Sequence, residues 1–407
     1  MWLIYKTAID NKDTNTMIPF EEAMAITLET PIRTGTERVD FNNALYRILA
    51  EDILSDVDMP PFHKAAMDGY ACRKADLDKE LKVLEVLAAG DIPTAFVGPG
   101  QCSKIMTGAM VPGGADTVIM VEHTEECTPG HIRFTGEKTA SNIARKAEDV
   151  RAGDRVLDQG TLILPQHTPI LASVGCTSPL VSKKVRVGIL STGDELVEPH
   201  ITPGPGKIRN SNGFQLIAQV RAAHCEPNYL GIIPDNEEDT DRAIGKALAE
   251  NNVVILTGGV SAGDFDFVPK IMRKNGVDIR FQKVAVKPGR PTVFGTTENA
   301  AIFGLPGNPV SSFVNFEVFV KPLLFKMMGH QYLPLVLKMP LDTHYKRKKA
   351  DRVEFIPAHI SQEGTVVPAR YHGSAHIHAM SLANGIMRIP KGTFELKKGD
   401  YTDVRPI

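Results

Sequence analysis

The chain has 407 residues, 43% of them hydrophobic and 6% aromatic, with a formal net charge of −2. This length exceeds what one hydrophobic core usually supports, so three or four globular domains are expected. The near-neutral charge gives no reason to expect a nucleic-acid partner, and no apolar run approaches the ~20 residues of a membrane-spanning helix. The start, Met1–Lys6, is too short and too soon charged for a signal peptide. We therefore expect a cytoplasmic protein.

The first half of the chain indicates short helices followed by a small β domain. A helix is expected after Pro19, and Val39–Asp52 should add a second short helical segment. From Asp56 the chain becomes rich in Gly and Pro and carries four short β-branched runs, which favour strands. These runs are Val83–Ala88, Cys102–Met106, Thr117–Val121 and His131–Phe134.

Residues 183–327 alternate short β-branched runs with helical segments, which predicts a mostly parallel, doubly wound sheet. In such sheets ligands bind outside the carboxyl ends of the strands. Each predicted strand leads into a loop of chemically useful residues, so we expect these loops to converge on one site. The strands are Val185–Leu190, Tyr229–Ile233, Val253–Leu256, Val284–Val286 and Ala301–Phe303.

The residue types in these loops indicate phosphate and magnesium binding. Gly258-Gly259 permits close backbone approach, and Ser311 stands near the start of a helix expected from about Val310, which suits an oxyanion. Lys287 and Arg290 could clamp the same anion. The loops also carry too many carboxylates for a purely anionic ligand, and a bound Mg²⁺ would resolve that conflict. The carboxylates are Asp194, Glu195, Asp235, Asp264 and Asp266.

Each motif also has a purely structural interpretation. Gly258-Gly259 could be a tight turn, and Lys287 and Arg290 could be solvated surface charges. Asp266 could cap the helix that has Pro269 in its first turn. These explanations become less economical when five loops agree. The five cysteines are widely spaced without a Cys-x-x-Cys pair, so a disulfide framework or zinc site is not expected.

Motifs along nearly the whole chain resemble the molybdopterin molybdenumtransferase family of the MoeA type, which includes the E domain of gephyrin. Their joint order is more specific than any one of them. The motifs are Pro60–Phe62 with Ala66–Ala71, Ile105–Ala109 with Val111-Pro112, Asn142-Ile143 with Glu148-Asp149, Ser191–Leu196, Thr257–Asp266, Lys287–Pro291 and Gly304–Ser311.

The resemblance implies a multidomain fold of α/β and β parts. A split N-terminal domain (1–55 and 150–182) would carry a small β domain (56–149) as an insertion. A central doubly wound α/β domain of the molybdopterin-binding type (183–330) would follow. The chain would end in a C-terminal β-barrel-like domain (331–407), where residues 335–407 alternate apolar and polar positions.

The resemblance also implies a reaction, in which molybdate is inserted into adenylylated molybdopterin and AMP is released. Catalytic roles would fall to Asp68, Thr107, Glu195, Asp235 and Asp266, and Mg²⁺ binding to Asp194, Glu195, Asp235 and Asp266. The expected substrate contacts are Asp149, Gly258, Gly259, Ser261, Lys283, Lys287, Arg290, Pro291, Pro306, Pro309, Ser311, Arg352 and Ser381.

In the family, the active site is shared between the protomers of a homodimer. The resemblance thus implies that Asp68, Thr107 and Asp149 act in trans, and that a molybdopterin adenylyltransferase is a possible partner. One segment departs from the family pattern. Ala144 stands where a second arginine is common, although Arg145 and Lys146 keep the segment basic, and Ala147 stands where a glycine is common before Glu148-Asp149.

Two other functions fit the resemblance less well. A molybdopterin adenylyltransferase would need only an α/β domain of ~150 residues. A noncatalytic gephyrin-like scaffold could lose its loop carboxylates and cations, whereas this chain retains them.

Overall fold

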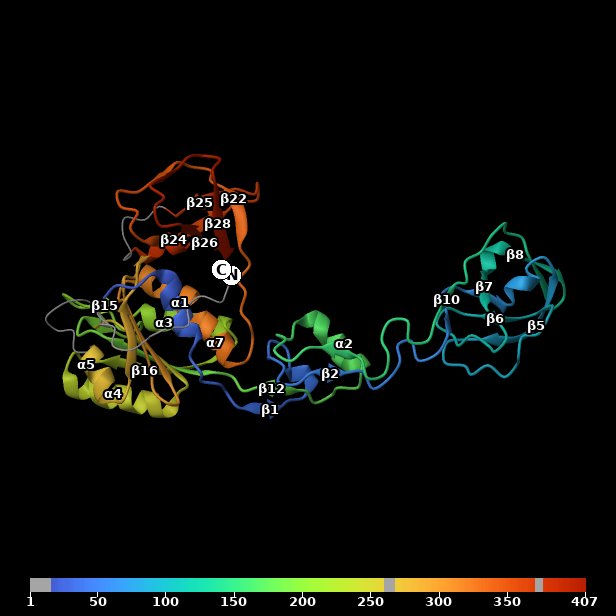
Figure 1. The fold of residues 1–407 in the computed structure, drawn as a ribbon, viewed down its shortest axis with the longest axis horizontal. Coiled ribbons are helices and arrows are strands. Elements are labelled where there is room, and N and C mark those ends of the chain that lie inside the picture. The colour runs from blue at the N-terminus through green and yellow to red at the C-terminus, as the bar shows by residue number, and fades with distance from the viewer. Residues whose placement is uncertain (1–15, 260–267, 370–375) are drawn as a thin grey trace. The chain divides into compact units, whose positions relative to one another are not determined.

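A computed structural model describes residues 16–259, 268–369 and 376–407 (Figure 1). These form two compact units, which we describe separately. Of the described residues, unit 1 comprises 16–37, 46–50, 180–259, 268–369 and 376–407, and unit 2 comprises 38–45 and 51–179. The chain passes between the units four times: within β1 (Thr36–Arg38), between residues 45 and 46, between residues 50 and 51, and just before β12 (Leu180–Ser182). Within the described ranges, no helix is long and apolar enough to span a membrane.

Unit 1 is built on a six-stranded sheet of mostly parallel strands, as the sequence predicts. Four neighbouring strands run parallel, and β20 pairs antiparallel with both β21 and β18. In order across the sheet these are β16 (Glu226–Ile233), β13 (Arg186–Thr192), β17 (Val253–Thr257), β21 (Ala301–Leu305), β20 (Pro291–Thr296) and β18 (Asp278–Lys283). The three central parallel strands are almost entirely buried, which explains their unbroken apolar sequences.

Helices cover both faces of this sheet. Figure 1 shows α4 and α5 on one side and α3 and α7 on the other. Ile244 of α4 and Ile271 of α5 belong to one core cluster with Leu256 of β17. The helices are α3 (Asn212–Ala222), α4 (Glu237–Glu250), α5 (Val268–Lys274), α6 (Pro309–Asn315) and α7 (Lys321–Met327), with a π-helical segment at Phe316–Val320.

The predicted helix after Pro19 is α1 (Phe20–Leu28). The Phe20 ring packs against Phe319 of the π-helical segment and Phe355 of the C-terminal sheet, with centroid separations of 5.4 and 5.1 Å. Helix α1 therefore joins the α/β part of unit 1 to the C-terminal part.

The strand predicted at Val284–Val286 differs from the expectation. The observed strand is β19 (Val286–Lys287), and it pairs in parallel with β24 of the C-terminal sheet rather than with the α/β sheet. The apolar run alone could not reveal this, because strand partners are chosen by tertiary packing. The consequence is functional: the Lys287 loop lies where the two sheets meet.

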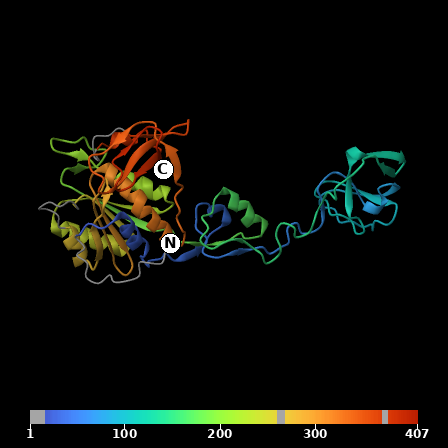
Figure 2. The ribbon, with the colours of Figure 1, turned by 45° about the horizontal axis from the view of Figure 1, so that its top comes forward.

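The C-terminal sheet curls toward a barrel. Its strand order is β19-β24-β26-β28-β22. Strand β25 stands outside this order and pairs antiparallel with residues 358–360 of β24. A bridge between Leu341 and Val366 links the end of β22 to β25 and so closes the ring. Figure 2 shows these strands, in red, beside the α/β part. The strands are β22 (Leu337–Pro340), β24 (Val353–Ile360), β25 (Val366–Pro368), β26 (Gly385–Ile389) and β28 (Tyr401–Pro406).

Unit 2 contains a six-stranded sheet of its own, with the order β7-β4-β6-β5-β9-β8. Four of its strands match the predicted runs closely. The strands are β4 (Gly69–Cys72), β5 (Glu80–Leu87), β6 (Gln101–Ile105), β7 (Thr117–Met120), β8 (Thr124–Thr128) and β9 (His131–Phe134). All five cysteines of the chain are free thiols.

Short strand pairs and one helix complete the fold. Helix α2 (Thr168–Ser173) and the pairs β2 (Ile53–Leu54) with β11 (Arg155–Leu157) and β3 (Lys64–Ala65) with β10 (Ile143–Ala144) belong to unit 2. The pairs β14 (Leu196–Val197) with β15 (Ile208–Arg209) and β23 (Tyr345–Lys346) with β27 (Glu395–Leu396) belong to unit 1. The sequence predicts four domains, a finer division than these two units, and it stays a prediction.

Candidate functional site

The predicted loops meet at one edge of the α/β sheet. The carboxyl ends of β13, β16, β17 and β21 share this edge because these strands are parallel. Strand β18 runs in the same direction as β21, since both are antiparallel to β20, so it also ends at this edge. The loop from Lys283 to Pro291 therefore joins the others, although β19 within it pairs with another sheet.

The Gly258-Gly259 pair holds three of these loops in contact. Both residues have positive φ, 96° and 63°. A Cβ atom on Gly258 would lie 2.4 Å from the Thr192 carbonyl oxygen after β13, and a Cβ atom on Gly307 after β21 would lie 3.7 Å from the Gly258 Cα. Only glycine fits this conformation and spacing without strain. Gly258-Gly259 therefore forms a tight turn and also lets the neighbouring loops approach closely, so the two interpretations of this motif do not exclude each other.

Acidic residues gather beside this glycine pair. The Asp235 backbone N–H donates to Asp194 Oδ1 at 3.1 Å, which brings the ends of β13 and β16 together. Desolvation raises the pKa of the Asp235 carboxyl, and the negative charges of Asp194 and Glu195 raise it further. Among the residues that the structure describes, no group of three His, Cys, Asp or Glu is placed to hold a metal ion. Three predicted residues, Ser261, Asp264 and Asp266, lie outside the described residues.

A cavity of about 1270 Å³ lies between the Lys287 loop, the start of α6 and the C-terminal sheet. Its lining includes six predicted substrate contacts: Lys287, Arg290, Pro291, Pro306, Ser311 and Arg352. It also includes the Lys346–Lys349 segment, so seven Lys or Arg side chains face two carboxylates, Asp351 and Glu354. This excess of positive charge in a concave site suits an anionic ligand.

Lys287 is anchored by a buried ionic network that sequence reasoning missed. Its Nζ lies 2.8 Å from Glu354 Oε1, and Arg347 Nη1 lies 3.1 Å from Glu354 Oε2. The Tyr345 hydroxyl also donates to Glu354 Oε2 at 2.8 Å. Glu354 and Arg347 are buried, whereas the Lys287 side chain is 46% exposed. Lys287 can therefore reach a ligand from a fixed position.

The Gly289 turn beside Lys287 is locked by α6. Asn315 Nδ2 donates to the Gly289 carbonyl at 3.2 Å and to Thr292 Oγ1 at 2.7 Å, and Thr292 Oγ1 donates to the same carbonyl at 2.7 Å. Gly289 has φ 94°, and a Cβ there would lie 2.3 Å from Asn315 Nδ2. The loop that presents Lys287 and Arg290 is thus rigid.

Three other predicted contacts of unit 1 stand apart from the cavity lining. Lys283 ends β18, and its carbonyl accepts from the Ile18 N–H at 3.0 Å. Ser381 follows a short 3₁₀ helix and donates to the His378 carbonyl at 2.8 Å. Pro309 begins α6 next to the lining residue Asn308.

The predicted residues of unit 2 form their own local contacts. Asp68 Oδ1 accepts from both the N–H and the Oγ1 of Thr107 at 2.6 Å. The Thr107 hydroxyl and then its N–H lower the pKa of Asp68. Asp149 donates its N–H to the Met59 carbonyl at 3.0 Å. Ala144, at the atypical family position, lies in β10.

Family models match three successive stretches of the chain. They are described as the MoeA N-terminal region, domains I and II (residues 18–175), a probable molybdopterin binding domain (188–326) and the MoeA C-terminal region, domain IV (340–407). A molybdopterin molybdenumtransferase of Haemophilus influenzae is 41% identical, and the match covers 96% of this chain and 99% of the relative.

The chain belongs to the MoeA family. A molybdopterin molybdenumtransferase of Bacillus subtilis is 35% identical over 96% of this chain and 94% of the relative. A crystal structure of a MoeA protein from Pyrococcus horikoshii OT3 superposes with a TM-score of 0.84 at 31% identity, covering 96% of this chain and all of that one. The multidomain fold expected from the resemblance is confirmed by these MoeA neighbours.

Proposed function

We propose that this protein is a molybdopterin molybdenumtransferase that inserts molybdate into adenylylated molybdopterin and releases AMP. The observation that carries the proposal is the cationic cavity next to a cluster of carboxylates at one sheet edge. Molybdate and the phosphates of the pterin are anions, and hydrolysis of a phosphate anhydride is favoured by charge neutralisation on the reacting phosphates. The names of the full-length relatives support the same reaction.

In this proposal Lys287 and Arg290 bind the oxyanion, with Ser311 and Arg352 on the surrounding wall. Charge-assisted hydrogen bonds from such groups are stronger than neutral ones. The buried Glu354 positions Lys287 and balances part of the positive charge. Asn315 keeps the Gly289 turn closed, so that the cations lose little conformational freedom when the anion binds.

Mg²⁺ is the proposed cofactor. The raised pKa of Asp235 reflects partial desolvation and repulsion from Asp194 and Glu195, and a bound cation would relieve that repulsion. Their carboxylate oxygens are the type of ligand that a hard divalent cation prefers, and Asp266 is proposed as a further ligand. When bound, Mg²⁺ would neutralise charge on the phosphates of the substrate.

We also propose a cytoplasmic homodimer whose active site is shared between protomers. Asp68, Thr107 and Asp149 of unit 2 would then serve the cavity of the partner. The short hydrogen bonds from Thr107 to Asp68 support a fixed, ionised carboxylate there. A molybdopterin adenylyltransferase would supply the adenylylated substrate and is the proposed protein partner.

A complementation experiment tests this function. The gene would be expressed in a bacterial strain that lacks its own molybdopterin molybdenumtransferase, and the activity of an endogenous molybdoenzyme would be measured. Restored activity is expected with the wild-type chain and not with Lys287→Ala. Failure of a well-expressed wild-type chain to restore activity would contradict the proposal.

A further inference from the structure

The helix that begins at the cationic cavity changes its winding within the core of unit 1. Helix α6 runs into the π-helical segment Phe316–Val320, and all five residues of this segment are buried. The Lys321 N–H donates to the Phe316 carbonyl, five residues back. In this wider winding the donor for the Glu317 carbonyl would be residue 322, which is a proline without an N–H. Such π-helical turns occur frequently at functional sites, and this one needs a donor from outside the helix.

Arg405 of β28 supplies that donor. Its Nη1 donates to the Glu317 carbonyl at 2.9 Å, and its Nη2 lies 3.1 Å from Glu317 Oε2. Lys321 Nζ lies 3.1 Å from the same carboxylate oxygen, and Gln219 Nε2 donates to Glu317 Oε1 at 3.1 Å. A buried carboxylate is costly unless it is paired and hydrogen-bonded, and here both oxygens have partners. We call Glu317 and Arg405 the π-turn pair.

The Arg405 guanidinium is itself held in place. Its Nη2 also donates to the Tyr332 hydroxyl at 2.9 Å, and the guanidinium carbon lies 5.4 Å from the centroid of the Tyr332 ring. That ring stacks on Phe325 of α7 with a centroid separation of 4.8 Å. A lysine could not make all of these contacts, because its ammonium is a point charge without the planar fork of arginine. The π-turn pair is therefore a rigid link between the helix and β28.

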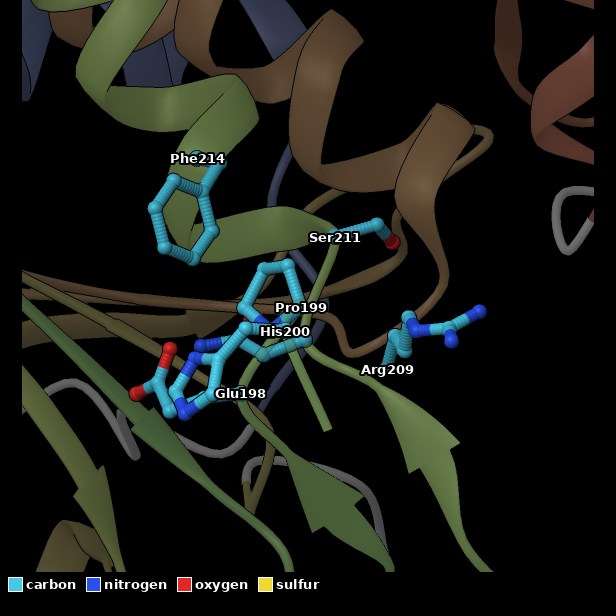
Figure 3. A pocket seen from close by; sticks show the side chains of 7 residues that line it. Glu198, Pro199, His200, Arg209, Ser211 and Phe214 are labelled. Atoms are coloured by element: carbon cyan, nitrogen blue, oxygen red, sulfur yellow. The ribbon is translucent and has the colours of Figure 1, made fainter. Parts of the chain in front are cut away.

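Helix α3 fastens the same helix from another direction. Gln219 Nε2 also donates to the Phe313 carbonyl of α6 at 3.2 Å. Asn212, at the start of α3, donates to the Gly307 carbonyl at 2.7 Å, just before α6. Figure 3 shows this first turn of α3, where Phe214 lines a separate pocket of about 580 Å³. Helix α6 is thus fixed to α3 near both of its ends.

The π-turn pair joins the two supports of the anion-binding loop. Asn315, the last residue of α6, holds the Gly289 turn, and Glu354 of β24 holds Lys287. Strand β24 lies beside β26, and β26 lies beside β28, which carries the arginine of the pair. The pair therefore sets the spacing between the helix that holds one part of the loop and the sheet that holds the other.

We propose that the π-turn pair is a specificity element of the anion site, which keeps the Lys287–Arg290 loop at a spacing that fits molybdate better than the smaller sulfate. Sulfate has the same charge and tetrahedral shape, so positive charge alone does not distinguish the two anions. Discrimination by size needs binding groups that cannot close around the smaller ion, and a loosened site loses it. Glu317 and Arg405 do not line the cationic cavity, so both are positioning residues. The choice of molybdate rests on the proposed function.

Titration calorimetry with molybdate and with sulfate tests the proposal through the ratio of the two affinities. In Arg405→Met, Glu317 keeps its two other side-chain partners, so we expect this variant to fold. Its molybdate-to-sulfate affinity ratio should fall about tenfold, because small misplacements of positioned groups have large effects. Arg388→Met is the matched control, since it removes another arginine ion pair, with Glu21 at 3.1 Å, from the same sheet. The control should keep the wild-type ratio.

Two further variants separate positioning from a general loss of stability. Ile244→Val leaves a small void in the core on the α4 side of the sheet, so it should unfold at lower urea concentration and keep the wild-type ratio. The double variant Glu317→Gln/Arg405→Met removes both charges of the pair together, so neither is left buried without the other. It should show the same reduced ratio as Arg405→Met. An unchanged ratio in either folded variant of the pair, an equal loss of both affinities, or a reduced ratio in Ile244→Val would overturn the proposal.

The complementation experiment keeps this inference distinguishable from the proposed function. If the wild-type chain restores molybdoenzyme activity while variants of the π-turn pair keep the wild-type ratio, the role of the pair is wrong and the function stands. If the wild-type chain prefers molybdate and the variants lose that preference, the role of the pair stands even where complementation fails. Equal affinity of the wild-type protein for molybdate and sulfate would overturn the inference, because there would be no selectivity to maintain.

Discussion

Replacing Lys287 with alanine should separate ligand binding from folding. An ion pair with a solvent-exposed partner contributes only about 0–1 kcal/mol to stability. The Lys287 side chain is 46% exposed, and Glu354 would keep Arg347 at 3.1 Å and Tyr345 at 2.8 Å. We therefore expect Lys287→Ala to fold with a free energy of unfolding within about 1 kcal/mol of the wild type.

The same substitution should weaken molybdate binding strongly. Hydrogen bonds to charged groups contribute about 1.5–3 kcal/mol, which corresponds to a loss of roughly 10- to 100-fold in affinity. Titration calorimetry with molybdate would measure the loss, and urea unfolding would measure the stability. Lys338→Ala is the matched control, because Lys338 is exposed on β22 and does not line the cavity. Unchanged molybdate affinity in folded Lys287→Ala would refute the role given to this lysine.

Three further predictions concern the acidic cluster, the glycine pair and the dimer. Asp235→Asn should abolish AMP release, yet in magnesium-free buffer at pH 7 it should unfold at higher urea concentration. The raised pKa of Asp235 means that the folded state disfavours the charged carboxylate. The added stability of Asp235→Asn should therefore vanish below pH ~4, where the wild-type carboxyl is protonated in both the folded and the unfolded protein. Gly258→Ala should lower the free energy of unfolding by about 1–3 kcal/mol, because alanine is strained at a φ of 96°. A free energy of unfolding equal to that of the wild type would contradict the close approach to Thr192. Mixed Asp68→Ala and Asp235→Ala chains should recover about a quarter of wild-type turnover if the site is shared in a dimer; no recovery after confirmed subunit exchange would contradict sharing.

The α/β part was predictable because its strands are buried on both faces and end in distinctive loops. The apolar runs before Asp194, Asp235 and Gly258 are observed as β13, β16 and β17. Parallel strands place their carboxyl ends together, so the meeting of these loops followed from the pattern. The same reasoning was wrong for Val284–Val286, since β19 pairs with β24 instead.

The supporting residues of the site could not be predicted in the same way. Glu354 contacts Lys287, and Asn315 contacts Gly289, across sequence separations that no local pattern reports. Residues Lys346–Lys349 were a visible basic run, but only the fold places them on the cavity wall. The sequence holds one signal of this network: Glu354 stands between apolar residues in the strand pattern of β24. Charged residues are rarely buried without a partner, so this position could have indicated a buried ion pair.

AMP release from adenylylated molybdopterin tests the central claim most directly. Purified protein would be incubated with this substrate and magnesium, with and without molybdate, and AMP and pterin-bound molybdenum would be quantified together. We predict that AMP appears in step with molybdenum incorporation in the wild-type protein and that Lys287→Ala forms neither product. Absence of AMP release and molybdenum incorporation from folded wild-type protein with both substrates present would contradict the account.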